Sequence, residues 1–522
     1  MSESILKRKR PGGDVARHDK PKKTVKVQAV NEKPSGLKKA QKESPASHAN
    51  GKSKPAATST TSNKTNSPSS IQIITGSYER VLHGFIATLP DKLPTSPSSS
   101  TTDSPQATFS DTFLFSAHSS SVRSLAISQA QASKRILATG SSDERINLYQ
   151  LSTSAPSRAK SGPSKPDLPS LSGASVVENP RNRELGSLLH HSRTITSLLF
   201  PTKSKLFSAA EDNTIGITRT RDWTTLSTIK APVPKPFGRP SGDTAAPGEV
   251  PSGVNDFAVH PSMKLMLSVS KGEKCMRLWN LVTGKKAGVL NFSKEVLMQV
   301  GEGRFSTGEG RRVLWRNDGE GFVVIFERGV VVYGMESTPE RIVRLQSGKI
   351  CQARFVPAQD GVLAVSTEDG RVLFYDVGSK SDEVDEKSLP KCSCIAEIPT
   401  LEARSSGRIK DFEILELPEP HQSTLVFVTA SSDGAARLWA IEKSSLDAPV
   451  ASNGAVSGKA DATGKEVKSV GALIGVRETG NRLTCIVAFV MDEPTIDGAE
   501  ESRPAEEPAV PNGDLDSESD EE

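Results

Sequence analysis

Short apolar runs rich in β-branched residues recur along the middle of this 522-residue chain, separated by polar turn residues. After each turn comes a second segment in which apolar and polar positions alternate. Alternation with a period of two predicts β-strands, and short strands in regular succession without helical stretches indicate an all-β architecture. The runs that open these strand pairs are residues 71–75, 136–139, 265–269, 322–326, 362–365 and 425–429.

A repeat accompanies the strand pairs. An acidic residue recurs in the turn between paired strands, and an aromatic residue follows six positions later. A unit of about 40–45 residues is typical of the four-stranded blade of WD40 propellers. Seven repeats, each of at least this size and lengthened by polar insertions, predict a seven-bladed WD40 β-propeller. The pairs are Glu79/Phe85, Asp143/Tyr149, Glu273/Trp279, Glu327/Tyr333, Asp369/Tyr375 and Asp433/Trp439, and Asp212 is the seventh acid, with Thr218 at the aromatic position.

The spacing also predicts a polar network inside each blade. The acid would accept a hydrogen bond from a histidine ahead of the first strand. That histidine would contact Ser or Thr on the second strand, which in turn reaches the aromatic residue. Such a chain stabilises a core only when every member is satisfied. The predicted structural network comprises His118, Asp143, Tyr149, His191, Asp212, Glu273, Trp279, Asp369, Tyr375, Asp433 and Trp439.

Two blades supply the fullest sets. Blade two offers His118 with Thr139 or Ser141, and blade three offers His191 or His190 with Ser208. No histidine precedes blades five, six or seven, so we expect those blades to depend on apolar packing. We interpret the histidines as structural rather than catalytic or metal-binding, because they fall at the repeat's own positions, and we place His260 in a loop.

The ring is expected to close between the two ends of the folded region, residues 71–491. Residues 71–89 supply only inner strands of a blade, and residues 482–490 resemble its missing first strand. Sharing a blade removes the exposed sheet edge. Polar insertions should form surface loops at residues 90–110, 152–183, 230–252, 378–391 and 443–468.

Charge is segregated at the two ends. Residues 1–66 hold 16 Lys and Arg against 5 acids, and residues 492–522 hold 13 acids and one Arg. Composition predicts that residues 1–68 form a disordered basic arm and residues 492–522 a disordered acidic tail. The arm contains a candidate nuclear import signal and could attract rRNA phosphates without sequence preference. The signal comprises Lys7, Arg8, Lys9, Arg10, Lys20, Lys22 and Lys23, and Ser517 and Ser519 are candidate phosphorylation sites in the tail.

Motifs for catalysis, phosphate binding or metal binding are not evident in this sequence. Residues 301–310 are Gly-rich, but no Gly-Lys-Ser/Thr follows, so we interpret them as a loop rather than a phosphate-binding site. The five cysteines lack the spacing and histidine partners of a zinc site. No signal peptide or membrane-spanning run is present, which predicts a soluble intracellular protein. We expect no enzyme activity, no cofactor, no metal and no membrane partner.

Several stretches resemble the p21-activated-kinase-interacting WD-repeat family, whose fungal members are the maintenance-of-killer ribosome-assembly factors. The similarity is carried by residues 74–85, 139–144, 190–196, 208–212, 260–265, 277–282, 431–434 and 481–485. It implies a seven-bladed propeller, residence in the nucleus and nucleolus, and a role in rRNA processing within precursors of the large ribosomal subunit. The animal branch also implies binding and restraint of p21-activated kinase, although animal members carry a Lys-rich C-terminal tail where this chain is acidic.

Three functional hypotheses follow. The first is a non-catalytic protein-interaction scaffold in large (60S) ribosomal subunit biogenesis, whose partners are assembly factors and ribosomal proteins. The second is a negative regulator that binds p21-activated kinase directly. The third is a substrate receptor of a ubiquitin ligase, ranked last because the chain contains no Trp-Asp-x-Arg sequence.

Overall fold

The computed structural model describes residues 69–94, 106–155, 178–234, 251–303, 306–357, 359, 361–378, 388–399, 407–447 and 467–492. All of them belong to the compact unit Thr65–Glu522. The basic arm with its import signal lies outside the described residues, as do residues 493–522 with Ser517 and Ser519. Within the described part, no helix is both long and apolar enough to cross a membrane.

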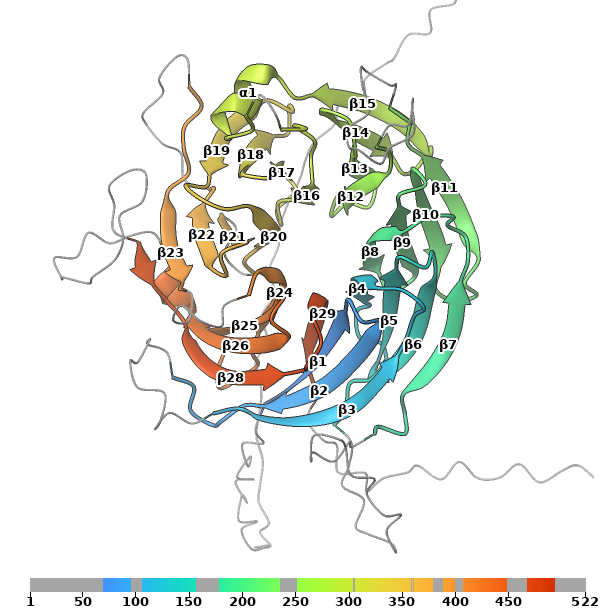
Figure 1. Ribbon diagram of the computed structural model, residues 1–522, viewed down its shortest axis with the longest axis vertical. Coiled ribbons are helices and arrows are strands. Elements are labelled where there is room, and N and C mark those ends of the chain that lie inside the picture. Colours follow the sequence, from blue (N-terminus) through green and yellow to red (C-terminus); the bar gives the residue numbers. More distant parts are fainter. Residues whose placement is uncertain are drawn as a thin grey trace, which may run out of the picture. The chain divides into compact units, whose positions relative to one another are not determined.

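Seven sheets, antiparallel except where β27 joins the sixth, are arranged around a centre (Figure 1), which confirms the predicted seven-bladed propeller. In each blade the first strand lies nearest the centre and the fourth lies at the rim. Blade 1 contains β29 (Leu483–Val490), β1 (Ser70–Ser77), β2 (Val81–Thr88) and β3 (Thr108–Ser116); blade 2 contains β4 (Val122–Ile127), β5 (Lys134–Ser141), β6 (Ile146–Ser152) and β7 (Arg183–Leu188); blade 3 contains β8 (Ile195–Thr202), β9 (Lys205–Ala210), β10 (Thr214–Arg219) and β11 (Thr225–Lys230).

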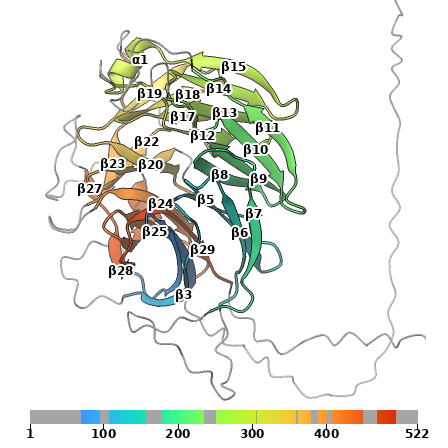
Figure 2. The ribbon, with the colours of Figure 1, turned by 45° about the vertical axis from the view of Figure 1, so that its right-hand side comes forward.

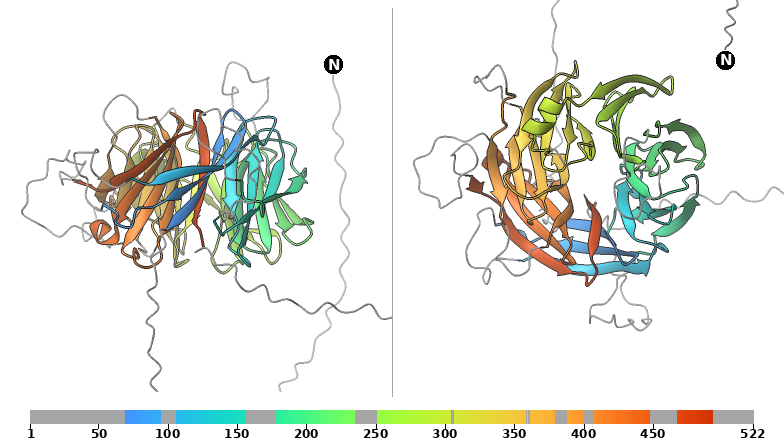
Figure 3. Two further views of the ribbon diagram at one scale, coloured as in Figure 1. Left: turned by 90° about the horizontal axis from the view of Figure 1, so that it is seen from below. Right: turned by 45° about the horizontal axis from the view of Figure 1, so that its top comes forward.

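The remaining four blades follow in chain order around the ring, as the views in Figure 2 and Figure 3 show. Blade 4 contains β12 (Val254–Val259), β13 (Leu265–Ser270), β14 (Cys275–Asn280) and β15 (Lys285–Asn291); blade 5 contains β16 (Arg312–Trp315), β17 (Gly321–Ile325), β18 (Gly329–Gly334) and β19 (Pro339–Arg344); blade 6 contains β20 (Ile350–Phe355), β21 (Val362–Thr367), β22 (Val372–Asp376), β23 (Cys394–Ile398) and β27 (Lys468–Ser469); blade 7 contains β24 (Ile409–Glu416), β25 (Thr424–Ser431), β26 (Ala435–Glu442) and β28 (Ala472–Glu478).

The two ends of the folded region share blade 1, as the sequence predicted. Strand β29 pairs antiparallel with β1, placing Ile74 opposite Val487 and Ile71 opposite Val490. This pairing covers the inner edge of β1, which would otherwise expose unpaired backbone groups. The chain's last described strand therefore completes its first blade.

Apolar packing lies between neighbouring blades. The buried residues form seven clusters, and each cluster draws on two adjacent blades. Because each sheet is covered on both sides, the middle strands are apolar at successive positions rather than alternate ones. Strand β25, for example, is buried along its whole length. This explains the short continuous apolar runs in the sequence.

Three local features differ from the sequence expectations. A short helix, α1 (Lys294–Gln299), interrupts the connection between blades 4 and 5, where we expected no helix. It begins at Ser293, whose side chain accepts a hydrogen bond from the Val296 amide. The insertion expected at 90–110 is shorter, because β3 already begins at Thr108.

The insertion expected at 443–468 also contains structure. A 3-10 helix, η1 (Lys443–Leu446), opens it, and Leu446 is buried. At its far end β27 pairs in parallel with β23, adding a fifth strand to blade 6. The prediction of a plain polar loop was wrong at both ends, because apolar residues within it, Leu446 and Val467, are buried.

Candidate functional site

The acidic residues of the repeat all lie in turns between the second and third strands of their blades. Since strands alternate in direction, these turns share one face of the ring with the connections from one blade to the next. We call this the turn face. The structure therefore places the predicted acids at corresponding positions in successive blades.

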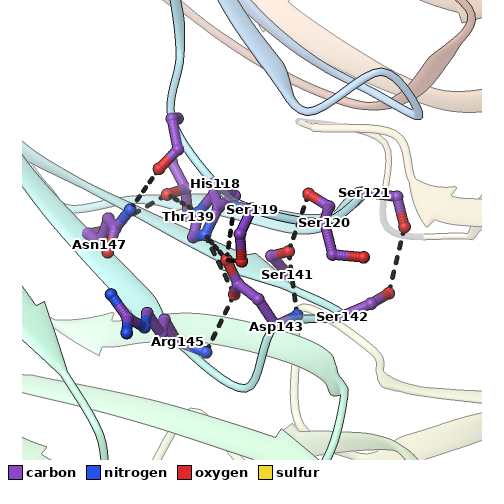
Figure 4. A network of polar contacts seen from close by, with 11 residues as sticks. His118, Ser119, Ser120, Ser121, Thr139, Ser141, Ser142, Asp143, Arg145 and Asn147 are labelled. Carbon is purple, nitrogen blue, oxygen red and sulfur yellow. Dashed lines mark hydrogen bonds and ion pairs between the residues drawn. The ribbon is translucent and has the colours of Figure 1, made fainter.

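Blade 2 brings its histidine, threonine and aspartate together (Figure 4). His118 Nδ1 lies 3.1 Å from Asp143 Oδ2, and His118 Nε2 lies 2.8 Å from Thr139 Oγ1. The same carboxylate accepts hydrogen bonds from the backbone amides of Ser119 (3.0 Å) and Arg145 (3.1 Å). These bonds join the loop before the first strand to the turn between the second and third.

Of the two residues offered for the second strand of blade 2, Thr139 is the one bonded to His118; the Ser141 hydroxyl donates to the Ser120 carbonyl and accepts from the Asp143 amide. The expected bond from the second strand to the aromatic ring of Tyr149 was wrong. Thr139 faces Asn147 instead, and Tyr149 packs in the apolar cluster between blades 1 and 2.

The environment fixes the charge states in blade 2. Burial lowers the pKa of His118 and outweighs the neighbouring Asp143 carboxylate, which acts to raise it. Burial acts to raise the pKa of Asp143, but its hydrogen bonds from Ser119 and Arg145 and its contact with His118 prevail and lower it. A neutral imidazole beside a carboxylate is therefore the favoured arrangement.

Blade 3 uses two adjacent histidines rather than one. His191 Nδ1 lies 3.1 Å from Asp212 Oδ2, and its Nε2 lies 2.8 Å from Ser208 Oγ. His190 Nε2 reaches the same Ser208 hydroxyl at 2.9 Å. Burial, followed by the charge of its neighbour His191, lowers the pKa of His190 to about 4.

A glycine makes room for the second histidine. A Cβ atom on Gly216 of β10 would lie 2.7 Å from His190 Nε2 and 3.0 Å from Ser208 Oγ. Gly216 occupies the position that Asn147 occupies in blade 2, four residues after the acid. The missing side chain in blade 3 is replaced by an imidazole from the preceding loop.

In blades 4 and 7 an arginine lies beside the acid. Arg277 Nη2 donates to Glu273 Oε1 at 2.6 Å, and Arg437 Nη2 donates to Asp433 Oδ2 at 2.6 Å. Blade 4 also contains the expected contact to an aromatic residue, since Trp279 Nε1 donates to Ser268 Oγ at 2.8 Å.

Blades 5 and 6 also pair their acids with cations. Glu327 pairs with Arg311 at 3.0 Å and with Lys349, and Asp369 pairs with Arg371 at 2.5 Å. Blades 5 to 7 therefore combine the expected apolar packing with ion pairs at the acids, which the sequence reasoning did not foresee. Tyr333, Tyr375 and Trp439 are all buried in clusters between blades.

Blade 1 contains a pair that sequence reasoning missed. His83 Nε2 lies 2.9 Å from Asp111 Oδ1, and Asp111 Oδ2 accepts from Arg477 at 2.5 Å. Arg477 belongs to β28, so this group joins the rims of blades 7 and 1. The available signal was the position of His83, four residues after Glu79, where blades 4 and 7 have arginine.

The remaining candidates lie outside any such network. His260 sits in the turn between β12 and β13, 3.1 Å from the Gly319 carbonyl oxygen and edge-on to Trp315. All five cysteines have free thiols. Among the described residues, no three His, Cys, Asp or Glu side chains gather as a metal-binding group.

Comparisons with known proteins agree with this architecture. Residues 109–150 match the WD40 family, described as WD domain, G-beta repeat. A "p21-activated protein kinase-interacting protein 1-like" from Xenopus laevis is 27% identical over 421 residues, which covers 81% of this chain and 82% of that protein. "Protein MAK11" from Saccharomyces cerevisiae is 27% identical over 392 residues, which covers 70% of this chain and 77% of that protein.

The chain is a homologue of these proteins. The human "p21-activated protein kinase-interacting protein 1" is likewise 26% identical over 374 residues, covering 72% of this chain and 71% of the human protein. The resemblance recognised from the sequence motifs is thus confirmed over most of the folded region. The similarity extends through the blades rather than being limited to one repeat.

Proposed function

We propose that this chain is a non-catalytic protein-interaction scaffold that acts in the nucleolus on precursors of the large (60S) ribosomal subunit. The observation that carries the proposal is similarity to MAK11 over 392 residues, since we assign MAK11 to the ribosome-assembly branch of the family. The partners would be assembly factors and ribosomal proteins bound on the faces of the ring.

Side-chain chemistry supports a scaffold rather than an enzyme. The histidines and carboxylates that could suggest catalysis are engaged with one another inside blades, as in the His118, Thr139 and Asp143 group. Groups held in this way connect strands and loops. They give a rigid ring whose exposed turns are available for partners.

The test is affinity purification of the tagged full chain at low salt. Large-subunit precursor rRNA and ribosomal proteins should be recovered, and deletion of residues 493–522 should leave recovery unchanged. A variant with alanine at Lys7, Arg8, Lys9 and Arg10 should lose recovery through reduced nuclear import. Absence of ribosomal components from the wild-type purification would refute the proposal.

A second candidate function is negative regulation of a p21-activated kinase by direct binding. It is favoured by the names of the animal relatives, which describe kinase-interacting proteins. Purified full chain and the kinase regulatory region should then bind in a titration at micromolar concentrations. No binding in that range would remove this candidate, and the ubiquitin-ligase hypothesis stays third.

A further inference from the structure

A polar hollow of about 230 Å³ lies on the turn face at blades 5 and 6. Its lining includes Gly301, Arg328, Arg344, Gly348, Lys349 and Glu368. Arg328 belongs to the turn between β17 and β18, and Arg344 ends β19. The hollow therefore forms where the blade turn meets the connection to the next blade.

Backbone hydrogen bonds fix the walls of this hollow. The Leu345 amide donates to the Arg328 carbonyl at 3.0 Å, and the Glu368 amide donates to the Lys349 carbonyl at 2.9 Å. Buried Glu302 accepts from the Arg328 amide at 3.2 Å. The charged side chains thus project from a pre-formed backbone frame.

Two of its cations have no acidic partner. Among the described residues, neither Arg328 nor Arg344 forms an ion pair, and both are exposed. Lys349 shares Glu327 with Arg311, and Glu368 pairs with Arg408 at 3.3 Å. The hydrogen bond from Lys349, with the nearby charge of Arg311, lowers the pKa of Glu327.

Further cations extend this region toward the inner strands. Burial raises the pKa of the Cys351 thiol, the second residue of β20, while the nearby charges of Lys410, Arg408 and Arg312 act to lower it, against Glu368, which acts to raise it. Cations exceed carboxylates across the region, apart from the mutually paired Asp369 and Arg371. We define the basic patch as Arg311, Arg312, Arg328, Arg344, Lys349, Arg408 and Lys410, which are accompanied by Glu302, Glu327 and Glu368.

We propose that the basic patch binds the phosphate groups of a single-stranded RNA backbone. An unpaired guanidinium presents a planar fork of donors that matches phosphate oxygens. The hollow offers polar and charged groups but no exposed apolar anchor, whereas peptide-binding interfaces depend on apolar and aromatic anchors. It also has no aromatic lining on which a base could stack, so binding is independent of sequence.

This site is distinct from the N-terminal arm, and its existence does not depend on the ribosomal proposal. The test compares the full-length wild type with the double variant Arg328→Ala/Arg344→Ala. A matched control, Arg193→Ala/Lys274→Ala, removes two exposed cations from the same face outside the patch. Affinity for a fluorescent 20-nucleotide oligouridine is measured at several salt concentrations, with circular dichroism to verify folding.

The patch variant should bind RNA about tenfold more weakly, and its slope of log affinity against log salt should fall by about 1.4, since each lost phosphate contact removes about 0.7. The control should keep the wild-type slope, because the arm contributes equally to all three proteins. An unchanged slope in the patch variant overturns the inference. The inference is also overturned if the patch variant loses binding to an oligoglutamate peptide but keeps its affinity for RNA, which would identify an acidic protein partner instead.

The two proposals fail separately. RNA binding by the patch is measured with purified protein, whereas the ribosomal role is measured by what the tagged chain recovers from cells. A salt slope that falls as expected, with no precursor recovered, would keep the patch and remove the ribosomal assignment.

Discussion

Removing the closing strand β29 should abolish folding of the ring, whereas removing the acidic tail should not. Residues that β29 buries against blades 1, 2 and 7 are at most 4% exposed, namely Leu483, Ile486, Val487 and Phe489. Burying one such side chain contributes about 1.5–3 kcal/mol, so these four contribute about 6–12 kcal/mol. A loss of that size equals the whole stability of a typical protein, about 5–15 kcal/mol.

Polar contacts add to the loss. The Ile486 amide donates to buried Asp411 at 3.1 Å, and Thr484 Oγ1 donates to the Val122 carbonyl at 2.7 Å. Without β29, the apolar clusters between blades 1 and 7 and between blades 1 and 2 would both lose buried side chains, and the backbone groups on the inner edge of β1 would be unpaired. Both interfaces of blade 1 would therefore be destabilised together.

The assay is urea unfolding followed by circular dichroism, with size-exclusion chromatography. A chain ending at residue 480 should be aggregated or non-cooperative, and a chain ending at residue 492 should keep the wild-type midpoint. The milder variant Ile486→Ala should cost about 2–5 kcal/mol. Its matched control is Val476→Ala, at a side chain that is 41% exposed, which should cost less than about 0.5 kcal/mol. A cooperative, wild-type-like transition in the chain ending at 480 would refute the closure argument.

Three further predictions concern the blade networks. Burial lowers the pKa of His190 from 6.5 to about 4, so its neutral form stabilises the fold above pH 6.5 and that stability is lost as the pH falls toward 4. The difference in unfolding free energy between wild type and His190→Asn should therefore change across this window in urea titrations. Comparing the two proteins cancels the opposite effect of Glu413, whose pKa burial raises to about 7. Gly216→Ala should cost about 1–3 kcal/mol and be relieved by adding His190→Ala, whereas Gly288→Ala, whose nearest contact would lie 4.0 Å away, should cost little; equal unfolding midpoints for the two single variants would contradict this. Trp279→Phe should cost about 1–2 kcal/mol through loss of the bond to Ser268, and a double-mutant cycle with Ser268→Ala should show the two changes to be less than additive.

The architecture could be predicted from the sequence because its determinants are local. The acid in each turn and the apolar run before it recur at fixed distances, and both are required by the same strand, turn and strand unit. Ring closure followed from the mismatch between an incomplete first blade and a spare strand at residues 482–490. Strand β27 could not be predicted in this way, because two residues give no periodicity and their pairing depends on where the edge of β23 lies.

The partners of the acids were less predictable, because a side chain on the third strand competes with a loop histidine for the same space. In blades 4 and 7 the residue four positions after the acid is arginine, and its guanidinium donates a hydrogen bond to the carboxylate. Arg277 is only 5% exposed, and its guanidinium donates to both carboxylate oxygens of Glu273. In blades 2 and 3 that position holds Asn147 or Gly216, both shorter, and a histidine from the preceding loop reaches the acid. In these four blades the residue at this position therefore decides whether the acid is bonded to the third strand of its own blade or to the preceding loop. A histidine-based pattern alone detects only the second case.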